Sequence, residues 1–151
     1  MKRAGIMKLI IESKLENVTL VGGAVRGIAN ALSLDEISCY HLELCVVEAV
    51  TNVTKHAYNN EAGNPVEVNI LLFPDRISFQ ICDRGKSMEP ANVRLLNFDP
   101  EQRETLPESG MGLFIMHALM DEVRYETVSG LNVLTMSKYL RQEGKAPVSP
   151  D

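Results

Sequence analysis

The sequence predicts a single domain of the α+β class, in which helical and strand patterns alternate along one continuous chain. Two observations predict it: a long, densely apolar helical stretch in the first half, and two pairs of strand patterns joined by short turns. No repeat or linker divides the chain, and 151 residues with 45% hydrophobic side chains suffice to bury one core. We therefore expect one folded unit over residues 1–143, followed by a frayed tail over residues 144–151.

The first two expected elements are a strand and a helix. Residues 7–15 have a strand-like composition, although their alternation is weak. A helix then begins at Asn17 or Thr19 and runs to Leu32. Three glycines each weaken this helix by about 1 kcal/mol relative to alanine: Gly22, Gly23 and Gly27. We interpret them as positions of close helix packing, with a flexible, partner-contacting surface as the alternative.

The next helix is the feature around which the rest of the chain is organised. Ser33 followed by Glu36 matches the capping-box pattern, so we expect the helix to begin at Ser33. Over residues 37–57 apolar side chains recur so densely that little of the helix surface is left for solvent. Glu48 and Asn52 nonetheless lie four residues apart and share one face. Such polar groups among valines must be paired or must line a cavity that holds something polar.

Two strand pairs are expected in the rest of the chain. After a turn cluster at residues 59–65, residues 66–72 and 77–81 alternate between apolar and polar side chains, which predicts a hairpin with one buried face. Residues 123–128 and 133–140 form the second pair, joined by a turn at residues 129–132.

Between the two hairpins, the pattern predicts a loop followed by a helix. Residues 88–110 are irregular, rich in proline and charge, and longer than an ordinary connection, which is typical of a lid or binding loop. Residues 113–120 are strongly apolar and predict a helix that opens on Gly110-Met111-Gly112.

Glycines at a helix start can bind an anion. The first N–H groups of a helix are free and the helix dipole favours negative charge there, so the turn is a candidate phosphate cradle. Its residues are Gly110, Met111, Gly112 and Leu113. A tight turn without any ligand would use the same glycines.

Asp83 ends a predicted strand beside Gly85, and this pair offers a subsite for a base. The carboxylate can accept from the exocyclic amine of a purine, while the glycine lets the base approach the backbone. An aspartate in this position, taken alone, is more often a turn former.

Asn52 and Glu48 suit phosphoryl-transfer chemistry. An amide oxygen is suited to Mg²⁺, which takes few protein ligands and keeps phosphates and water for the rest. Glu48, one turn earlier, could orient or deprotonate an attacking hydroxyl. A hydrogen-bond network between helix and loop is the structural alternative for this pair.

Composition excludes several classes of function. The net charge of −5 and the pI near 5.2 argue against direct nucleic-acid binding, which needs a basic surface. Charged residues interrupt the apolar run near the N-terminus, so we expect neither a signal peptide nor a membrane span. Three cysteines without CxxC spacing predict neither a disulfide framework nor a zinc site, and indicate the reducing cytoplasm.

Together the motifs resemble the three nucleotide-binding boxes of the Bergerat-fold ATPases. The boxes are Glu48-xxx-Asn52-xxx-His56, Asp83-Arg-Gly85-Lys-Ser87 and Ser109-Gly110-Met-Gly112-Leu. Three boxes in this order are specific where each alone is weak. The small size and the run Glu-Ala-Val-Thr-Asn are similar to the bacterial anti-sigma-factor serine/threonine kinases, and the match covers residues 7–140.

The resemblance implies a two-layer sandwich, with a mixed, mainly antiparallel sheet covered on one face by helices. ATP would bind between the central helix and the lid, with Asn52 holding Mg²⁺ and Glu48 acting as general base for a protein hydroxyl. Asp83 would read adenine with Gly85 beside it, and the glycine turn would contact phosphate.

Two further positions follow from the same resemblance. His56 matches a place near the nucleotide phosphates, with a buried, backbone-bonded helix histidine as an equal alternative. Ser87 stands where many members of the superfamily have a second glycine, and a serine at this position is common in the anti-sigma branch.

The family implies a partner switch. The protein would phosphorylate a Ser or Thr of a small anti-sigma-factor antagonist, sequester a sigma factor and form a homodimer in the cytoplasm. Two alternatives are a nucleotide-binding regulator with little kinase activity and a switch acting on another signalling protein. Because only about thirty residues precede Ser33, we expect no phospho-acceptor helix pair upstream and hence not a complete histidine kinase.

Overall fold

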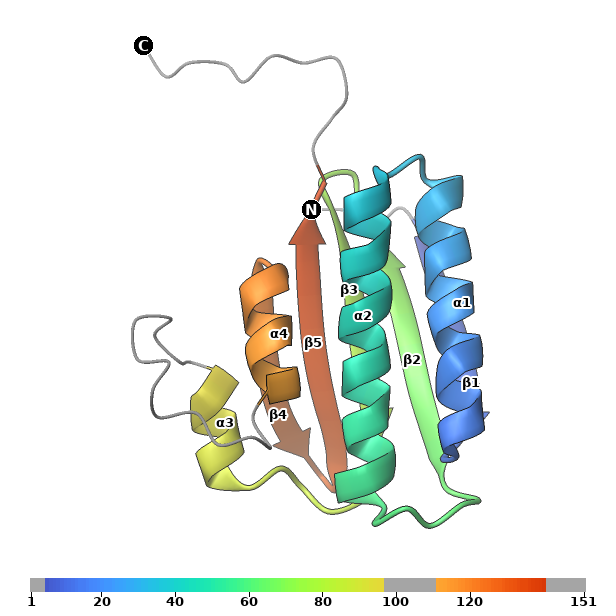
Figure 1. Ribbon diagram of the computed structural model, residues 1–151. Helices are drawn as coiled ribbons and strands as arrows, with labels where there is room; N and C mark the ends of the chain where they lie inside the picture. The colour runs from blue at the N-terminus through green and yellow to red at the C-terminus, as the bar shows by residue number, and fades with distance from the viewer. Residues whose placement is uncertain (1–4, 97–110, 141–151) are drawn as a thin grey trace.

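The computed structural model describes residues 5–96 and 111–140. Within them, a five-stranded sheet is covered on one face by helices (Figure 1). The elements are β1 (Gly5–Glu12), α1 (Leu15–Ala31), α2 (Glu36–Asn52), the π-helix η1 (Val53–Ala57), β2 (Pro65–Leu72), β3 (Arg76–Asp83), α3 (Pro90–Leu96), α4 (Met111–Leu119), β4 (Glu122–Val128) and β5 (Leu131–Tyr139). The predicted two-layer α+β sandwich is confirmed.

The strand order is β1-β2-β3-β5-β4, and all four neighbouring pairs of described strands are antiparallel, so the expectation of a mixed sheet is wrong. The second hairpin therefore joins the first through β5, which lies next to β3. Their register places Asp83 directly opposite Asn132 at one end of the sheet. This pairing brings the predicted base subsite against the hairpin turn of β4 and β5.

The core lies between the sheet and helices α1, α2 and α4. Alternate side chains of β3 point towards the helices, and Ile77, Phe79 and Ile81 are each only 1% exposed. Burying a side chain of this size contributes about 1.5–3 kcal/mol. From α2 the core receives Leu42, Cys45, Val46, Ala49 and Val50. Because α2 crosses the middle of the sheet (Figure 1), this burial fixes where Glu48 and Asn52 lie.

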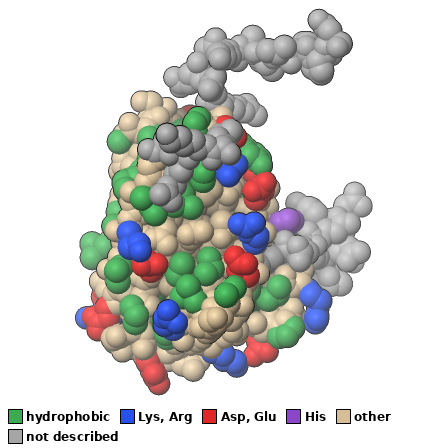
Figure 2. Space-filling model, turned by 180° about the vertical axis from the view of Figure 1, so that it is seen from behind, with side chains coloured by type: hydrophobic (Ala, Val, Ile, Leu, Met, Phe, Trp, Pro, Cys, Tyr) green, Lys and Arg blue, Asp and Glu red, His purple; other side chains and the backbone are tan. Residues whose placement is uncertain are grey.

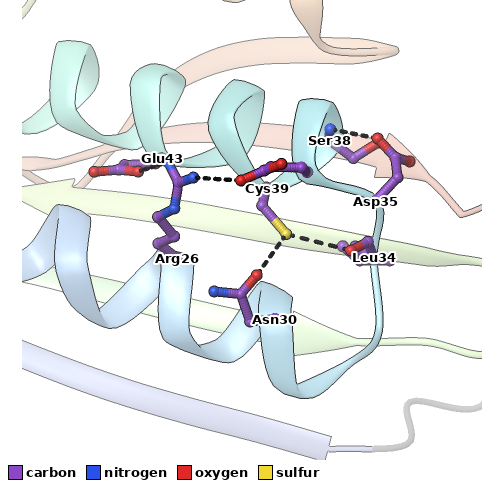
Figure 3. Close-up of polar contacts among 8 residues, drawn as sticks. Arg26, Asn30, Leu34, Asp35, Ser38, Cys39 and Glu43 are labelled. Carbon is purple, nitrogen blue, oxygen red and sulfur yellow. Dashed lines mark hydrogen bonds and ion pairs between the residues drawn. The ribbon is translucent and has the colours of Figure 1, made fainter.

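Helix α2 begins later than its capping box predicts. Its N-cap is Asp35, whose carboxylate accepts hydrogen bonds from the Ser38 N–H and hydroxyl, each at 2.8 Å (Figure 3). These bonds lower the pKa of Asp35. Ser33 instead adopts a positive φ of 59° in the turn before the helix. The predicted start at Ser33 is wrong because the chain needs those residues to turn back from α1.

The glycines of α1 divide into two kinds. A Cβ on Gly22 would lie 2.8 Å from Val47 of α2, so the packing interpretation holds there. Around Gly23 and Gly27 an added Cβ would meet nothing within 4 Å, and close packing is the wrong explanation for them. The two helices are also linked by a 3.0 Å ion pair between Arg26 and Glu43 (Figure 3).

All three cysteines are free and buried. The Cys39 thiol donates to Asn30 Oδ1 across the helix pair (Figure 3), and burial raises the pKa of Cys45 to about 12. Both behave as small core side chains.

The sheet face opposite the helices is partly apolar. It carries exposed Ile6, Ile10, Val128 and Tyr139, and Figure 2 shows hydrophobic side chains among charges of both signs on this side of the molecule. No described helix is long and apolar enough to cross a membrane.

Polar groups are also buried on this outer face, so the predicted single buried face of the first hairpin is wrong. Asn69 and Ser78 are 8% and 4% exposed. The hydroxyls of Ser78 and Ser137 lie 2.7 Å apart and satisfy each other, which makes their burial tolerable.

Other boundaries also differ from the predictions: β1 spans Gly5–Glu12 and not residues 7–15. Helix α1 begins at Leu15, before either predicted start. Residues 90–96 form helix α3 where an irregular segment was expected, because Pro90 occupies its first turn, the helical position that tolerates proline. The rest of the predicted lid, residues 97–110, and the predicted tail lie outside the described residues.

Candidate functional site

A cavity of about 240 Å³ opens between the end of α2, the loop after β3 and the start of α4. It is lined by Ala49, Asn52, Val53, His56, Ala57, Asn59, Ile81, Asp83, Lys86, Ser87, Met88, Glu89, Asn92, Leu113, Tyr125 and Leu134. Apolar side chains form its inner walls, and polar groups converge from three separate segments of the chain. This composition is typical of a small-molecule site.

Helix α2 continues past Asn52 into a π-helical turn, not the α-helix that the sequence predicts. The Tyr58 N–H donates to the Val53 carbonyl, five residues back, at 3.0 Å. Such turns occur frequently at functional sites. His56 on this turn is exposed and lines the cavity, so the alternative of a buried helix histidine is wrong.

Asp83 lines the cavity and is only 5% exposed. Its Oδ1 accepts from the Asn132 amide at 2.8 Å and from the Gly85 N–H at 2.9 Å. Burial raises the pKa of Asp83, and these two hydrogen bonds oppose that rise. Its Oδ2 accepts from none of the described residues and remains available to a ligand.

Gly85 is required for a reason that the sequence does not show. A Cβ there would lie 2.4 Å from the carbonyl oxygen of Ala57, at the end of η1. The next residue, Lys86, donates its N–H to the same carbonyl at 2.9 Å. Gly85 thus lets the loop pack on the helix end, whereas we expected it to admit a base.

Asn132 is a site residue that sequence reasoning missed. Its side chain is 1% exposed, and its Oδ1 accepts from the hydroxyls of Ser87 at 2.9 Å and Thr127 at 2.8 Å. The residue was assigned only to a hairpin turn. The sequence did offer one signal for this role: Asn132 lies two positions before the apolar Leu134, so both side chains share the inward side of β5.

Glu48, Asn52 and Gly112 come together at the start of α4. A Cβ on Gly112 would lie 2.8 Å from Glu48 Oε2 and 3.5 Å from Asn52 Nδ2. Neither polar side chain hydrogen-bonds to another residue of the described part of the chain, so the alternative of a helix-to-loop network finds no support there. Both half-buried groups face the helix terminus where an anion is favoured.

The glycine turn is described only in part. Gly110 lies outside the described residues, and Met111 is placed only as the first residue of α4. Leu113 is 4% exposed and contributes an apolar wall to the cavity. Met88, Glu89 and Asn92, which belong to the segment predicted as a lid, also line the cavity.

These residues fit a nucleotide with Mg²⁺. Asp83, whose Oδ2 accepts from none of the described residues, lines the cavity together with apolar side chains, as a 6-amino purine requires, and Leu113 from the first turn of α4 lines it as well. The Asn52 amide has no protein partner among the described residues, and Mg²⁺ needs only one or two protein oxygens beside phosphates and water. No described group of three His, Cys, Asp or Glu side chains forms a dedicated metal cluster.

The fold and this site define a histidine kinase-like ATPase domain, and residues 11–138 match the model of that family. The chain belongs to this family. Within it, the chain belongs with the RsbW serine-protein kinases. It is 31% identical to that of Oceanobacillus iheyensis over 140 residues, covering 91% of this chain and 88% of the relative. It is 33% identical to that of Bacillus licheniformis over 147 residues, covering 95% and 91%. The predicted anti-sigma-factor kinase family is confirmed.

Solved structures show the same fold. The RsbU and RsbW domains of Rv1364c from Mycobacterium tuberculosis match with a TM-score of 0.65 at 16% identity, covering 92% of this chain and 34% of that one. The SiaB–SiaC complex from Pseudomonas aeruginosa matches with a TM-score of 0.60 at 15% identity, covering 87% and 89%.

Proposed function

We propose that this family member transfers the terminal phosphate of Mg·ATP to a serine or threonine of a small anti-sigma-factor antagonist protein. In the same switch it sequesters a sigma factor, or another signalling protein, until the unphosphorylated antagonist displaces it. The observation that carries the proposal is the convergence of Glu48, Asn52 and Gly112 beside the cavity that Asp83 closes.

Each residue has a separate task in this reaction. Asp83 accepts from the adenine amine, while Leu113 and neighbouring apolar walls hold the ring. The N-terminus of α4, which begins at Met111, faces the phosphates, and His56 and Ser87 line the same cavity. Asn52 supplies an oxygen to Mg²⁺, which when bound neutralises phosphate charge.

Glu48 is the general base. Its carboxylate takes the proton of the antagonist hydroxyl as that oxygen bonds to the terminal phosphorus, and the bond from phosphorus to the ADP oxygen breaks. The product is a phosphorylated side chain with about two negative charges. Those charges meet an acidic protein of net charge −5, which favours release of the product.

Labelled ATP with purified candidate antagonists tests the division of roles. Glu48→Gln is expected to abolish transfer and keep ATP affinity, whereas Asn52→Ala loses Mg-dependent ATP binding itself. Glu67→Gln, on the outer sheet face, is the matched control and keeps both. ATP binding without transfer to any candidate would support the nucleotide-binding regulator, and equal loss of binding in both site variants would contradict the division of roles.

We also propose that the protein is a cytoplasmic homodimer that associates through its outer sheet face. That face exposes Ile6, Ile10 and Val128, and Ile10 is 66% exposed. Large exposed apolar side chains of this kind mark interaction surfaces. Light scattering of Ile10→Glu against the wild type tests it, and an unchanged mass would overturn the assignment of this face.

A further inference from the structure

Asn132 holds its side-chain amide in one orientation. Two hydroxyls, those of Ser87 and Thr127, donate to its oxygen. Its nitrogen therefore faces the other way, where it donates to Asp83 Oδ1 at 2.8 Å and to the Gly85 carbonyl at 3.0 Å. In the reversed orientation, the amide oxygen of Asn132 would face the Asp83 carboxylate and the Gly85 carbonyl, and two acceptors cannot form a hydrogen bond with each other. The network therefore fixes which end is the donor.

The same network fixes the two oxygens of Asp83. Oδ1 accepts from both Asn132 and the Gly85 N–H, so it is bound to two donors. Oδ2 accepts from no described residue, and Asp83 lines the cavity. While Asp83 is ionised, the atom offered to a ligand is therefore an acceptor, and the two bonds to Oδ1 fix which oxygen that is.

We infer that Asn132 is the positioning residue that sets the hydrogen-bonding polarity of the base subsite and so selects a 6-amino over a 6-oxo purine. This inference rests on the proposed function, in which the cavity binds ATP. Asn132 acts through Asp83 and does not touch the base.

An isosteric change at Asp83 should reverse the polarity of the base subsite. In Asp83→Asn, the two donors behind residue 83 require the amide oxygen at the Oδ1 position. The NH₂ group must then face the cavity, where it repels the adenine amine and donates to the 6-oxo group of hypoxanthine. Preference should therefore pass from ATP to inosine triphosphate, but only while Asn132 is present.

Four proteins and two nucleotides form the test: wild type, Asp83→Asn, Asn132→Leu and the double variant, each titrated with ATP and inosine triphosphate. The wild type is expected to prefer ATP at least about tenfold, since sites built around a hydrogen bond discriminate strongly. Asp83→Asn reverses the preference by a similar factor. Asn132→Leu weakens ATP binding about tenfold and reduces the preference, and the double variant shows none.

Two controls separate positioning from general damage. Asn69→Leu removes a buried amide from the outer sheet face and leaves the ratio of the two affinities unchanged. Thr127→Val removes one of the two hydroxyls on Asn132 and is expected to lower the ratio by a smaller factor than Asn132→Leu. Melting temperatures check that each variant is folded.

The outcomes also separate this inference from the proposed function. If the wild type binds ATP but Asp83→Asn keeps the ATP preference, the role of Asn132 is overturned and the nucleotide site stands. An unchanged ratio in folded Asn132→Leu has the same meaning. A wild type that binds neither nucleotide overturns the proposed function.

Discussion

The carboxylate of Glu48 lies directly against the backbone of Gly112, so close that a methyl group on Gly112 would sit 2.8 Å from Oε2. The contact joins the C-terminal part of α2 to the first turn of α4, and its two residues are more than sixty positions apart in the sequence. It aims the proposed base at the helix terminus that would hold phosphate. Glycine is needed there because any side chain would displace the carboxylate.

Gly112→Ala should therefore lower activity without harming the fold. The atom that must move is the end of a flexible side chain, and alanine is the better helix former by about 1 kcal/mol. We expect unfolding free energy to stay level or rise while phosphoryl transfer falls at least about tenfold, since small displacements of reacting groups are costly. Gly23→Ala, which meets nothing within 4 Å, should keep full activity. Wild-type transfer rates in Gly112→Ala would show that the contact is not functional.

Gly85→Ala should have the opposite profile and damage the fold. Its Cβ would meet backbone atoms of Ala57 at 2.4 and 2.7 Å, and these cannot rotate away. The loop must lift off the end of η1, breaking the bond from Lys86 N–H to the Ala57 carbonyl. We expect a loss of about 1–3 kcal/mol in urea unfolding, as for other overpacked sites. Gly27→Ala, at an open position, provides the comparison, and equal stability of the two variants would refute the steric account.

Substitutions at the start of α2 should distinguish its two candidate caps. Asp35→Ala should lower the urea midpoint, whereas Ser33→Ala should hardly change it, and Ser33→Gly should raise it because φ is positive there. The pKa of Asp35 is lowered in the fold. Its contribution is therefore complete above the unfolded pKa and disappears as the pH falls through the folded pKa. Loss of stability in Ser33→Ala and not in Asp35→Ala would show that Ser33 caps the helix, as the capping-box pattern predicts.

The elements were predictable wherever local pattern alone determines them. The long α2 helix and both hairpins follow from the spacing of apolar residues, and tertiary packing agrees with that spacing. The predicted start of α2 was wrong because serine and aspartate have similar N-cap preferences. Only the direction of the chain after α1 selects Asp35 over Ser33. Helix α3 could not be predicted from the sequence because a proline such as Pro90 can either end a helix or begin one.

The candidate site was predictable only in part, for a different reason. Glu48, Asn52 and Asp83 are unusual within their own segments, so the sequence singles them out. Asn132 and the role of Gly85 depend on strand register and on a loop meeting a helix end, which are long-range contacts that no local pattern contains. The spacing from Leu134 places Asn132 on the inward side of β5, but only the register with Asp83 shows what its side chain contacts.

The base subsite should cost the protein stability, and the cost should depend on pH. Burial raises the pKa of Asp83 above its usual value of 3.8 in spite of the two hydrogen bonds that lower it. Between the unfolded and folded pKa values the folded state binds more protons than the unfolded state, so stability falls as the pH rises through that window and stays lower above it. Asp83→Asn keeps an oxygen for Asn132 and Gly85 but has no charge to bury. The unfolding free energy of Asp83→Asn, relative to that of the wild type, should therefore increase as the pH is raised from about 4 to 7, near the usual carboxyl range.

Urea titrations across that range measure this difference in unfolding free energy, with Asp121→Asn as a control for losing a carboxylate elsewhere. Parallel stability curves for wild type and Asp83→Asn would mean that the buried carboxylate carries no such cost.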